Sequence, residues 1–196
     1  MTLSLAEVYV QMKDFDNAEK LLLDISKALP TQTTNRDTWI KQSALRLLVS
    51  LWQSQPERME TAAKTGEEAV LKNPKDEGAL ERLAEIYTNV KPDPAKAADI
   101  HEKLLALKPN DAELLHRLAS LYRQNAQYEK AIALYRQMMR GATQEQATTY
   151  AFHIAEILLQ TNRKEEAVAW AKQHLARDGA SSRELSMLAM FYEQAA

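Results

Sequence analysis

Histidines are the residues of this chain whose chemistry could matter most, because an imidazole can bind a metal or transfer a proton near neutral pH. Two of the four belong to short motifs with a carboxylate, Glu113-x-x-His116 and His153-x-x-Glu156, which place both groups on neighbouring turns of a helix. Paired motifs of this kind hold di-iron centres only when further carboxylates face them. The sequence has no HExxH motif and no histidine pair four residues apart. We therefore expect surface or groove histidines and no metal.

Other patterns of catalysis or cofactor binding are absent from the sequence. The chain has no cysteine, which excludes disulfides, thiolate zinc sites and cysteine nucleophiles. Its four glycines are scattered, so no glycine-rich phosphate loop exists, and no serine has the neighbours of a nucleophile elbow. We expect a protein that is not an enzyme and that holds no cofactor.

The composition favours helices and a water-exposed surface of balanced charge. Only four glycines and six prolines occur in 196 residues, and 25 basic residues oppose 27 acidic ones for a formal net charge of -2. That balance is unlike the basic surface of nucleic-acid-binding proteins. No apolar run reaches the length of a membrane helix, and the first residues do not resemble a signal peptide. We expect neither nucleic-acid binding nor direct membrane insertion, and the compartment stays open between cytoplasm and periplasm.

An internal repeat organises the chain. Residues 80–87 (LERLAEIY) align with residues 115–122 (LHRLASLY) at an offset of 35, and Leu, Arg, Leu, Ala and Tyr are identical. The preceding segments also match, since KNPKD at 72–76 corresponds to KPND at 108–111. Proline cannot donate the hydrogen bond that a continuing helix needs, and the following Asp can cap the next helix. A helix should therefore end, and another begin, at each of these turns.

Looser copies of the pattern Leu-Ala-x-x-Tyr extend the repeat over the chain. The leading residues have the numbers 5, 48, 83, 118, 154 and 188, so the successive spacings are 43, 35, 35, 36 and 34. A polar turn and a second amphipathic segment follow the first five copies, each segment with a small residue near its start: Ala18, Ala62, Ala97, Ala131 and Ala167. The sequence therefore predicts repeated helix pairs.

This pattern resembles the tetratricopeptide repeat, a 34-residue helix pair with Leu, a small residue, Tyr, Ala, a large apolar residue, Ala and Pro at set positions. The first copy fits through Leu5, Ala6, Tyr9, Ala18, Leu22, Ile25 and Pro30. The resemblance covers nearly the whole chain. It implies an all-α, right-handed superhelical solenoid of antiparallel helix pairs, about five pairs plus one extra C-terminal helix. The implied single domain spans 1–196, with repeats near 1–32, 39–75, 76–109, 111–143 and 146–179 and a partial repeat at 181–196.

Two parts of the chain depart from this repeat. The third unit has one extra residue in its Pro92-Asp93-Pro94 turn, and His101 stands where a large apolar residue is usual. The spacing of 43 adds polar residues after position 30, with a capping box at Thr34-x-x-Asp37 and a longer helix that contains Trp39. We expect the Trp39 side chain to pack on the first helix pair. The alternative is a loop that contacts a partner, with Trp39 as its anchor.

The resemblance also implies a binding groove, because in this family the first helix of each pair lines a concave surface that holds a peptide. The corresponding positions that we expect to contact a ligand are Arg46, Glu81, Glu85, Asn89, Glu113, His116, Arg123, Phe152 and Glu156. Their acidic bias predicts a basic or amphipathic peptide. The alternative interpretation is that they are ordinary exposed residues of amphipathic helices.

The function implied is a non-catalytic scaffold that binds proteins or peptides. Members that serve as chaperone adaptors grip a peptide carboxylate with Lys and Asn, but Glu81 and Glu85 occupy the matching positions of the third unit. Resemblance to those adaptors therefore stops at the fold. Two alternatives stay open: self-assembly into a homo-oligomer through the C-terminal helix, and a regulatory region of a larger enzyme or of a secretion or assembly protein.

Overall fold

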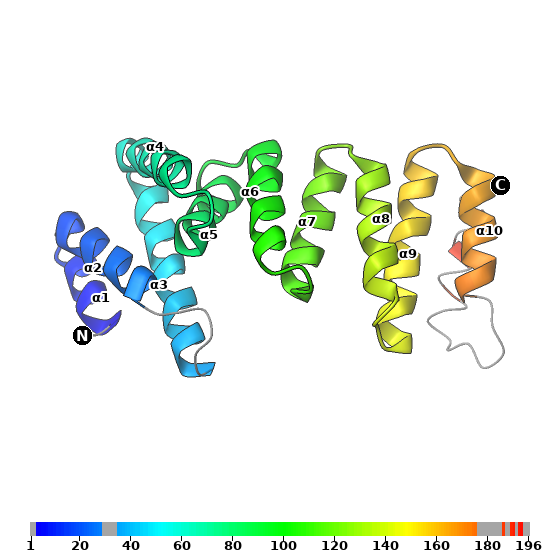
Figure 1. The fold of residues 1–196 in the computed structure, drawn as a ribbon, viewed down its shortest axis with the longest axis horizontal. Helices are drawn as coiled ribbons and strands as arrows, with labels where there is room; N and C mark the ends of the chain where they lie inside the picture. Colours follow the sequence, from blue (N-terminus) through cyan, green and yellow to red (C-terminus); the bar gives the residue numbers. More distant parts are fainter. Residues whose placement is uncertain (1–2, 29–34, 176–185, 187–188, 191, 194–196) are drawn as a thin grey trace. The chain divides into compact units, whose positions relative to one another are not determined.

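Helices account for the regular secondary structure of this chain in a computed structural model that describes residues 3–28, 35–175, 186, 189–190 and 192–193. They fall into two units, Met1–Pro109 and Asn110–Ala196. Figure 1 shows the helices of each unit in chain order, each lying beside the next. None of the described helices is long and apolar enough to cross a membrane.

Three helix pairs are described in the first unit. Their bounds are α1 Leu3–Gln11, α2 Phe15–Ala28, α3 Asn35–Ser54, α4 Pro56–Lys72, α5 Glu77–Glu85, a π-helical turn η1 Ile86–Val90, and α6 Pro94–Leu107. Each helix packs on the next one along the chain, and α3 also contacts α1, α5 and η1. The contacts of α3 join the first helices of the three pairs.

The described part of the second unit contains two helix pairs. Their bounds are α7 Ala112–Gln124, α8 Tyr128–Met139, α9 Gln144–Gln160 and α10 Lys164–Leu175. Here too α8 packs on α7 and α9, and α10 packs on α9 (Figure 1). The all-α fold of sequentially packed helix pairs is therefore confirmed. The predicted partial repeat at 181–196 lies almost wholly outside the described residues, and the repeat boundaries stay a prediction.

The proline-containing turns begin helices as predicted. The carboxylate of Asp76 accepts a hydrogen bond of 3.0 Å from the backbone N–H of Ala79 at the start of α5. At the start of α7 the Asp111 carboxylate accepts bonds from Glu113 and Leu114, both at 3.0 Å. These bonds satisfy amides that have no partner within a helix. Thr34 of the predicted capping box lies outside the described residues.

The repeated apolar residues form the cores of both units. Leu83 and Leu118 are each 1% exposed, and the alanines that follow them are buried as well. The small residue near the start of the second helix is also buried in four of the five pairs. The prediction for α4 was wrong by one position, because Ala63 is buried there and Ala62 is only half-buried. The turn before α4 consists of Gln55 alone, so the buried positions of α4 are shifted along the sequence relative to those of the other second helices.

Trp39 and His101 depart from apolar burial in opposite directions. The side chain of Trp39, near the start of α3, is 59% exposed, so the prediction that it packs on the first pair was wrong. His101 lies at an apolar position of α6 and is buried, with its Nδ1 2.8 Å from the carbonyl oxygen of Ala97. That contact satisfies one polar atom of the buried ring, which would otherwise cost free energy.

The first helices of three pairs end in the same way. A residue with left-handed backbone follows each helix, and a backbone N–H bonds a carbonyl five residues earlier, as Gln127 does to Tyr122 at 2.8 Å. These left-handed residues are Lys13, Ala126 and Asn162, with φ of 60°, 54° and 58°. The third pair has one residue more, and there Asp93 bonds Tyr87, six residues earlier, across the π-helical turn. The insertion seen in the sequence is thus absorbed as η1.

Replacing Ala126 by glycine should stabilise the chain. A side chain with a Cβ costs about 1–2 kcal/mol in the left-handed region, and the extra freedom of glycine in the unfolded chain offsets part of the gain. We expect the free energy of unfolding to rise by roughly 0.5–1 kcal/mol, measured by urea denaturation. The same change at Ala133, exposed within α8, should lower it by a similar amount. A loss of stability in both variants would contradict the expectation.

Candidate functional site

The first helices of the pairs in the first unit present polar side chains on their exposed faces. On α3 the predicted residue Arg46 is exposed, and its Nη2 donates to Ser43 Oγ at 3.0 Å. Further along α3 the Gln53 side chain is also exposed, and its Nε2 donates to the backbone carbonyl of Asn89 at 2.7 Å. This bond joins α3 to η1 and fixes the Gln53 side chain against η1.

A second polar group lies where α5 runs into η1. The Asn89 Nδ2 donates to Glu85 Oε2 at 2.6 Å, so these two predicted residues are brought together. The last carbonyls of a helical segment have no partner within it, and Gln53 donates to one of these, the carbonyl of Asn89 near the end of η1. We name Gln53, Glu85 and Asn89 the amide cluster.

Glu81, also predicted, lies among cations rather than open to a ligand. Its carboxylate contacts the ammonium of Lys41 on α3, and the Lys108 ammonium lies 3.6 Å from Oε1. Lys108 also contacts Glu77 at the start of α5. The side chains of Lys41 and Glu81 are 12% and 23% exposed, so this charge is largely neutralised within the unit.

On α7 of the second unit, the carboxylate of Glu113 accepts hydrogen bonds from Arg117, at 3.1 Å from Nε and 2.9 Å from Nη2. Its neighbour His116 is exposed. In the motif Glu113-x-x-His116, the Glu113 carboxylate is therefore paired with Arg117, one helical turn further on. An ion pair of this exposed kind contributes little to stability, about 0.3–0.5 kcal/mol.

A mixed cluster joins α7, α8 and α9. The Arg123 Nη1 lies 3.7 Å from Glu156 Oε2, and the same oxygen lies 3.2 Å from Nδ1 of His153. The His153 ring lies 5.2 Å from that of Tyr135, which is 2% exposed. Burial raises the pKa of the Tyr135 phenol, and a hydrogen bond from Arg123 acts against that rise. The structure thus brings together Arg123 and Glu156, two predicted residues.

Phe152 faces the core between α9 and α10 rather than open solvent. It packs, with Leu159 and Trp170, against a cluster of buried alanines, Ala151, Ala155 and Ala171. Its ring centroid also lies 6.1 Å from that of His153. Among the nine predicted residues, Phe152 is therefore the one with a clear packing role.

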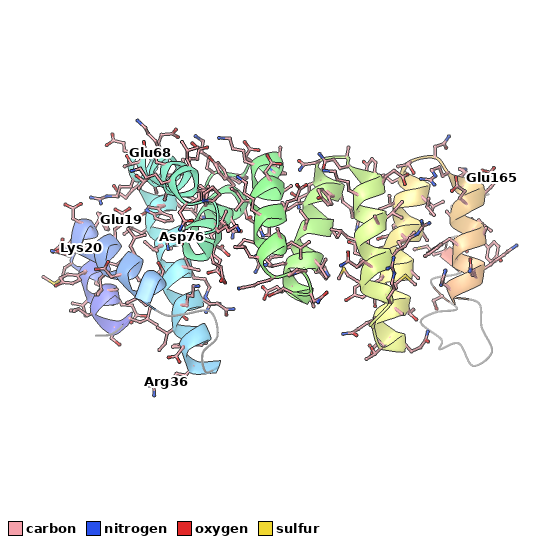
Figure 2. All side chains as sticks on the ribbon, in the orientation of Figure 1. Glu19, Lys20, Arg36, Glu68, Asp76 and Glu165 are labelled. Carbon is pink, nitrogen blue, oxygen red and sulfur yellow. The ribbon has the colours of Figure 1, made fainter. Side chains whose placement is uncertain are left out.

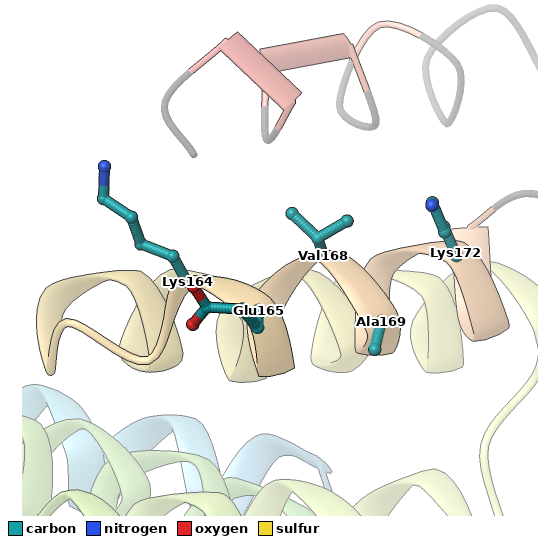
Figure 3. Close-up of a pocket in the computed structure, with 5 residues that line it drawn as sticks. All are labelled: Lys164, Glu165, Val168, Ala169 and Lys172. Atoms are coloured by element: carbon teal, nitrogen blue, oxygen red, sulfur yellow. The ribbon is translucent and has the colours of Figure 1, made fainter. Parts of the chain in front are cut away.

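The remaining surface features offer little chemistry. One face of α10 is hollowed between Lys164, Glu165, Val168, Ala169 and Lys172 (Figure 3), and Figure 2 shows Glu165 at the start of this helix. The Lys172 ammonium lies 5.4 Å from the centroid of the Tyr192 ring. Within the described ranges, no three His, Asp or Glu side chains converge as ligands of a metal ion. The polar groups described above are suited to hydrogen bonding and ion pairing.

Sequence reasoning missed the partners of the predicted acidic residues. Lys41 on α3 and Lys108 directly after α6 lie 40 and 27 residues away from Glu81 in the sequence, and no local pattern marks them. Trp39 could have been found, because it lies seven residues before Arg46 and so shares its face of the helix. The acidic bias read from the sequence is smaller in the structure, since Glu81, Glu113 and Glu156 each lie beside a basic residue.

Comparisons with known proteins agree with this architecture. Two models of the tetratricopeptide repeat match the sequence, one over residues 79–113 and the other over residues 102–133. These ranges span the two copies that align at an offset of 35. No protein of curated function matches the sequence significantly.

Solved structures share the fold at low sequence identity. A tetratricopeptide repeat protein from Parabacteroides merdae is 18% identical and has a TM-score of 0.52, with 98% of this chain and 71% of that chain covered. The MamA protein is 13% identical, also with a TM-score of 0.52, over 76% of this chain and 80% of that chain. At such identities the likeness concerns the fold alone.

Proposed function

We propose that this chain, which belongs to the tetratricopeptide repeat family, is a non-catalytic scaffold that binds polypeptide segments on the exposed faces of its first helices. Domains of this family generally bind proteins or peptides. What the structure adds is a set of exposed polar side chains on α3 and η1, held in place by contacts within the unit.

The amide cluster is the observation that supports this proposal most. Gln53 and Asn89 are exposed, and the carboxamide of each provides two N–H donors and one acceptor. One donor of Gln53 bonds η1, and one of Asn89 bonds Glu85. The other amide atoms can bond the backbone of an extended peptide, whose N–H and C=O groups need partners whatever its sequence. Because the internal bonds already orient both side chains, binding orders few additional groups.

The structure also bears on the chemistry of the ligand. Pairing with Lys41, Arg117 and Arg123 weakens the electrostatic reason to expect a basic peptide. An amphipathic peptide keeps its support, because the polar pair Ser43 and Arg46 lies on the same face of α3 as the exposed Trp39, four and seven residues further along. We therefore retain the amphipathic form of the sequence prediction.

Selection from a phage library of random 12-residue peptides against the full chain would test the proposal. The affinity of each selected peptide for the parent chain, for Gln53→Ala and for Asn89→Ala would then be measured by fluorescence anisotropy. We expect about fivefold weaker binding to each variant, since a neutral hydrogen bond contributes about 1 kcal/mol. Gln137→Ala is the matched control, because Gln137 is equally exposed but lies on α8, a second helix.

Thermal unfolding by circular dichroism separates binding from folding in these variants. A midpoint within two or three degrees of the parent would show that the helices are intact. If no peptide is selected, or if every variant binds like the parent chain, the first-helix faces are not the binding surface and the proposal is wrong.

A further inference from the structure

One face of α3 carries an unusual set of exposed side chains. This helix has 20 residues, more than any other described helix, and its extra turns precede the repeated signature. Positions three or four apart fall on one face, and along this face lie Arg36, Trp39, Ser43, Arg46, Ser50 and Gln53. We name this row the α3 stripe. The opposite face, with Ala44, Leu48 and Leu51, is buried.

Trp39 is the dominant apolar group of the α3 stripe. Its side chain is 59% exposed, whereas Trp52 on the same helix is 2% exposed. An indole can bury a large area while losing only two side-chain torsions, which is why tryptophan is enriched among the residues that contribute most to protein interfaces. The additional turns at the start of α3 thus place a large apolar side chain on the same face of the helix as Gln53 of the amide cluster.

The charges of the α3 stripe are of one sign. Arg36 and Arg46 are both exposed, and Figure 2 shows Arg36 at the start of α3. The α3 stripe contains no Asp or Glu. Among the described residues, no carboxylate forms an ion pair with either guanidinium, and Arg46 bonds the hydroxyl of Ser43. This differs from α5 and α9, where carboxylate and cation lie together.

We infer that the α3 stripe binds an acidic peptide segment that carries one large apolar side chain, which packs on Trp39 while its carboxylates pair with Arg46 and Arg36. This inference rests on the proposed function and names the partner class. A planar guanidinium matches a carboxylate with two parallel hydrogen bonds, so both arginines are suited to acidic side chains.

Helix geometry sets the spacing of the ligand groups. Trp39 and Arg46 are seven residues apart, which is about 10 Å along the axis at 1.5 Å per residue. An extended peptide covers that distance in about three residues at roughly 3.3 Å each. The ligand should therefore have Asp or Glu about three positions from its large apolar residue. A second acidic residue one or two positions to the other side would reach Arg36, three residues before Trp39.

The phage selection against the full chain gives the first test. Selected 12-residue peptides should be enriched in Asp or Glu about three positions from Trp, Phe or Leu. A fluorescein-labelled selected peptide should bind at least tenfold more weakly to Trp39→Ala and to Arg46→Glu, and binding should weaken as salt is raised. Leu71→Ala and Arg140→Glu are the matched controls, since Leu71 is exposed on α4 and Arg140 is exposed directly after α8, and binding should stay within twofold.

Acrylamide quenching of tryptophan fluorescence gives a readout at the α3 stripe itself. Most of the quenching attributable to Trp39, identified by its loss in Trp39→Phe, should disappear when the peptide is added. Enrichment of Lys or Arg in the selected peptides would overturn the acidic partner. A twelve-nucleotide thymidine oligomer that binds as tightly as the selected peptide would also overturn it and would assign the α3 stripe to nucleic acid. A concentration-dependent dimer that Trp39→Ala abolishes would assign the α3 stripe to a second copy of the chain.

The two proposals can fail separately in this experiment. Selected peptides that depend on Gln53 and Asn89 but not on Trp39 or Arg46 would overturn the acidic partner and leave the scaffold function supported. Peptides that respond to none of the four positions, or a selection that yields no binders, would overturn both.

Discussion

Replacing Tyr135 by alanine should lower the free energy of unfolding by about 3–5 kcal/mol, as for other large aromatic residues deleted from a core. The side chain of Tyr135 is 2% exposed on α8, and its ring lies 5.2 Å from His153 and 6.2 Å from Tyr150 on α9. Removing the ring leaves a cavity under the cluster that joins Arg123 to Glu156. Urea denaturation of the full chain, with hydrogen exchange of the α7 to α9 amides, would measure the loss.

Tyr135→Phe separates the ring from the hydroxyl. This variant keeps the packing and loses only the bond from Arg123, so we expect a loss of no more than about 1–1.5 kcal/mol. Equal losses in the two variants would mean that the polar contact, rather than the ring, holds α8 against its neighbours. A loss below about 1 kcal/mol in Tyr135→Ala would contradict the packing account altogether.

Replacing Ala155 by leucine should destabilise the contact between α9 and α10 by about 1–3 kcal/mol. Ala151, Ala155 and Ala171 are all 0% exposed and form one buried cluster, so the helices approach closely where their side chains are small. A leucine at position 155 must displace α10 or adopt a strained rotamer. The indole Nε1 of Trp170, which donates to the carbonyl of Ala151 at 3.0 Å, reports on that distance.

The measurement has two parts and a matched control. Urea denaturation gives the change in stability, and the ¹⁵N-indole signal of Trp170 in a nuclear magnetic resonance spectrum shows whether its bond to Ala151 persists. Ala133→Leu makes the same change at an exposed position of α8, where we expect a change within about 0.5 kcal/mol and no shift of the Trp170 signal. An unchanged free energy of unfolding in Ala155→Leu would show that α9 and α10 can move apart at no cost, which would contradict the prediction.

The helix pairs could be predicted because the interactions that define them are local. Asp76 and Asp111 cap helices through amides two or three residues further on, and a turn with proline can be recognised from its own few residues. Leu83 and Leu118 lie at the same place in successive copies, so one periodic pattern identifies the buried face of both. The single inserted residue near Pro92 was visible too, although its form as the π-helical turn η1 was not.

The electrostatics of the candidate site could not be predicted in the same way. Glu81 is neutralised by Lys41 and Lys108, which reach it only because α3 and the end of α6 lie beside α5. Likewise Arg123 on α7 lies beside Glu156 on α9, although 33 residues separate them in the chain. A pattern of exposed residues predicts which face they share, but the charge of that face depends on neighbours from other helices.

The sequence by itself determined the repeat, the helix pairs, the caps and most of the buried residues, because these follow from side chains within a few positions of one another. Tertiary structure decided which predicted site residues are paired, that Trp39 is exposed rather than packed, and that Gln53 bonds the carbonyl of Asn89. The physical reason is that burial and ion pairing depend on distances between helices, which close packing sets and local pattern does not.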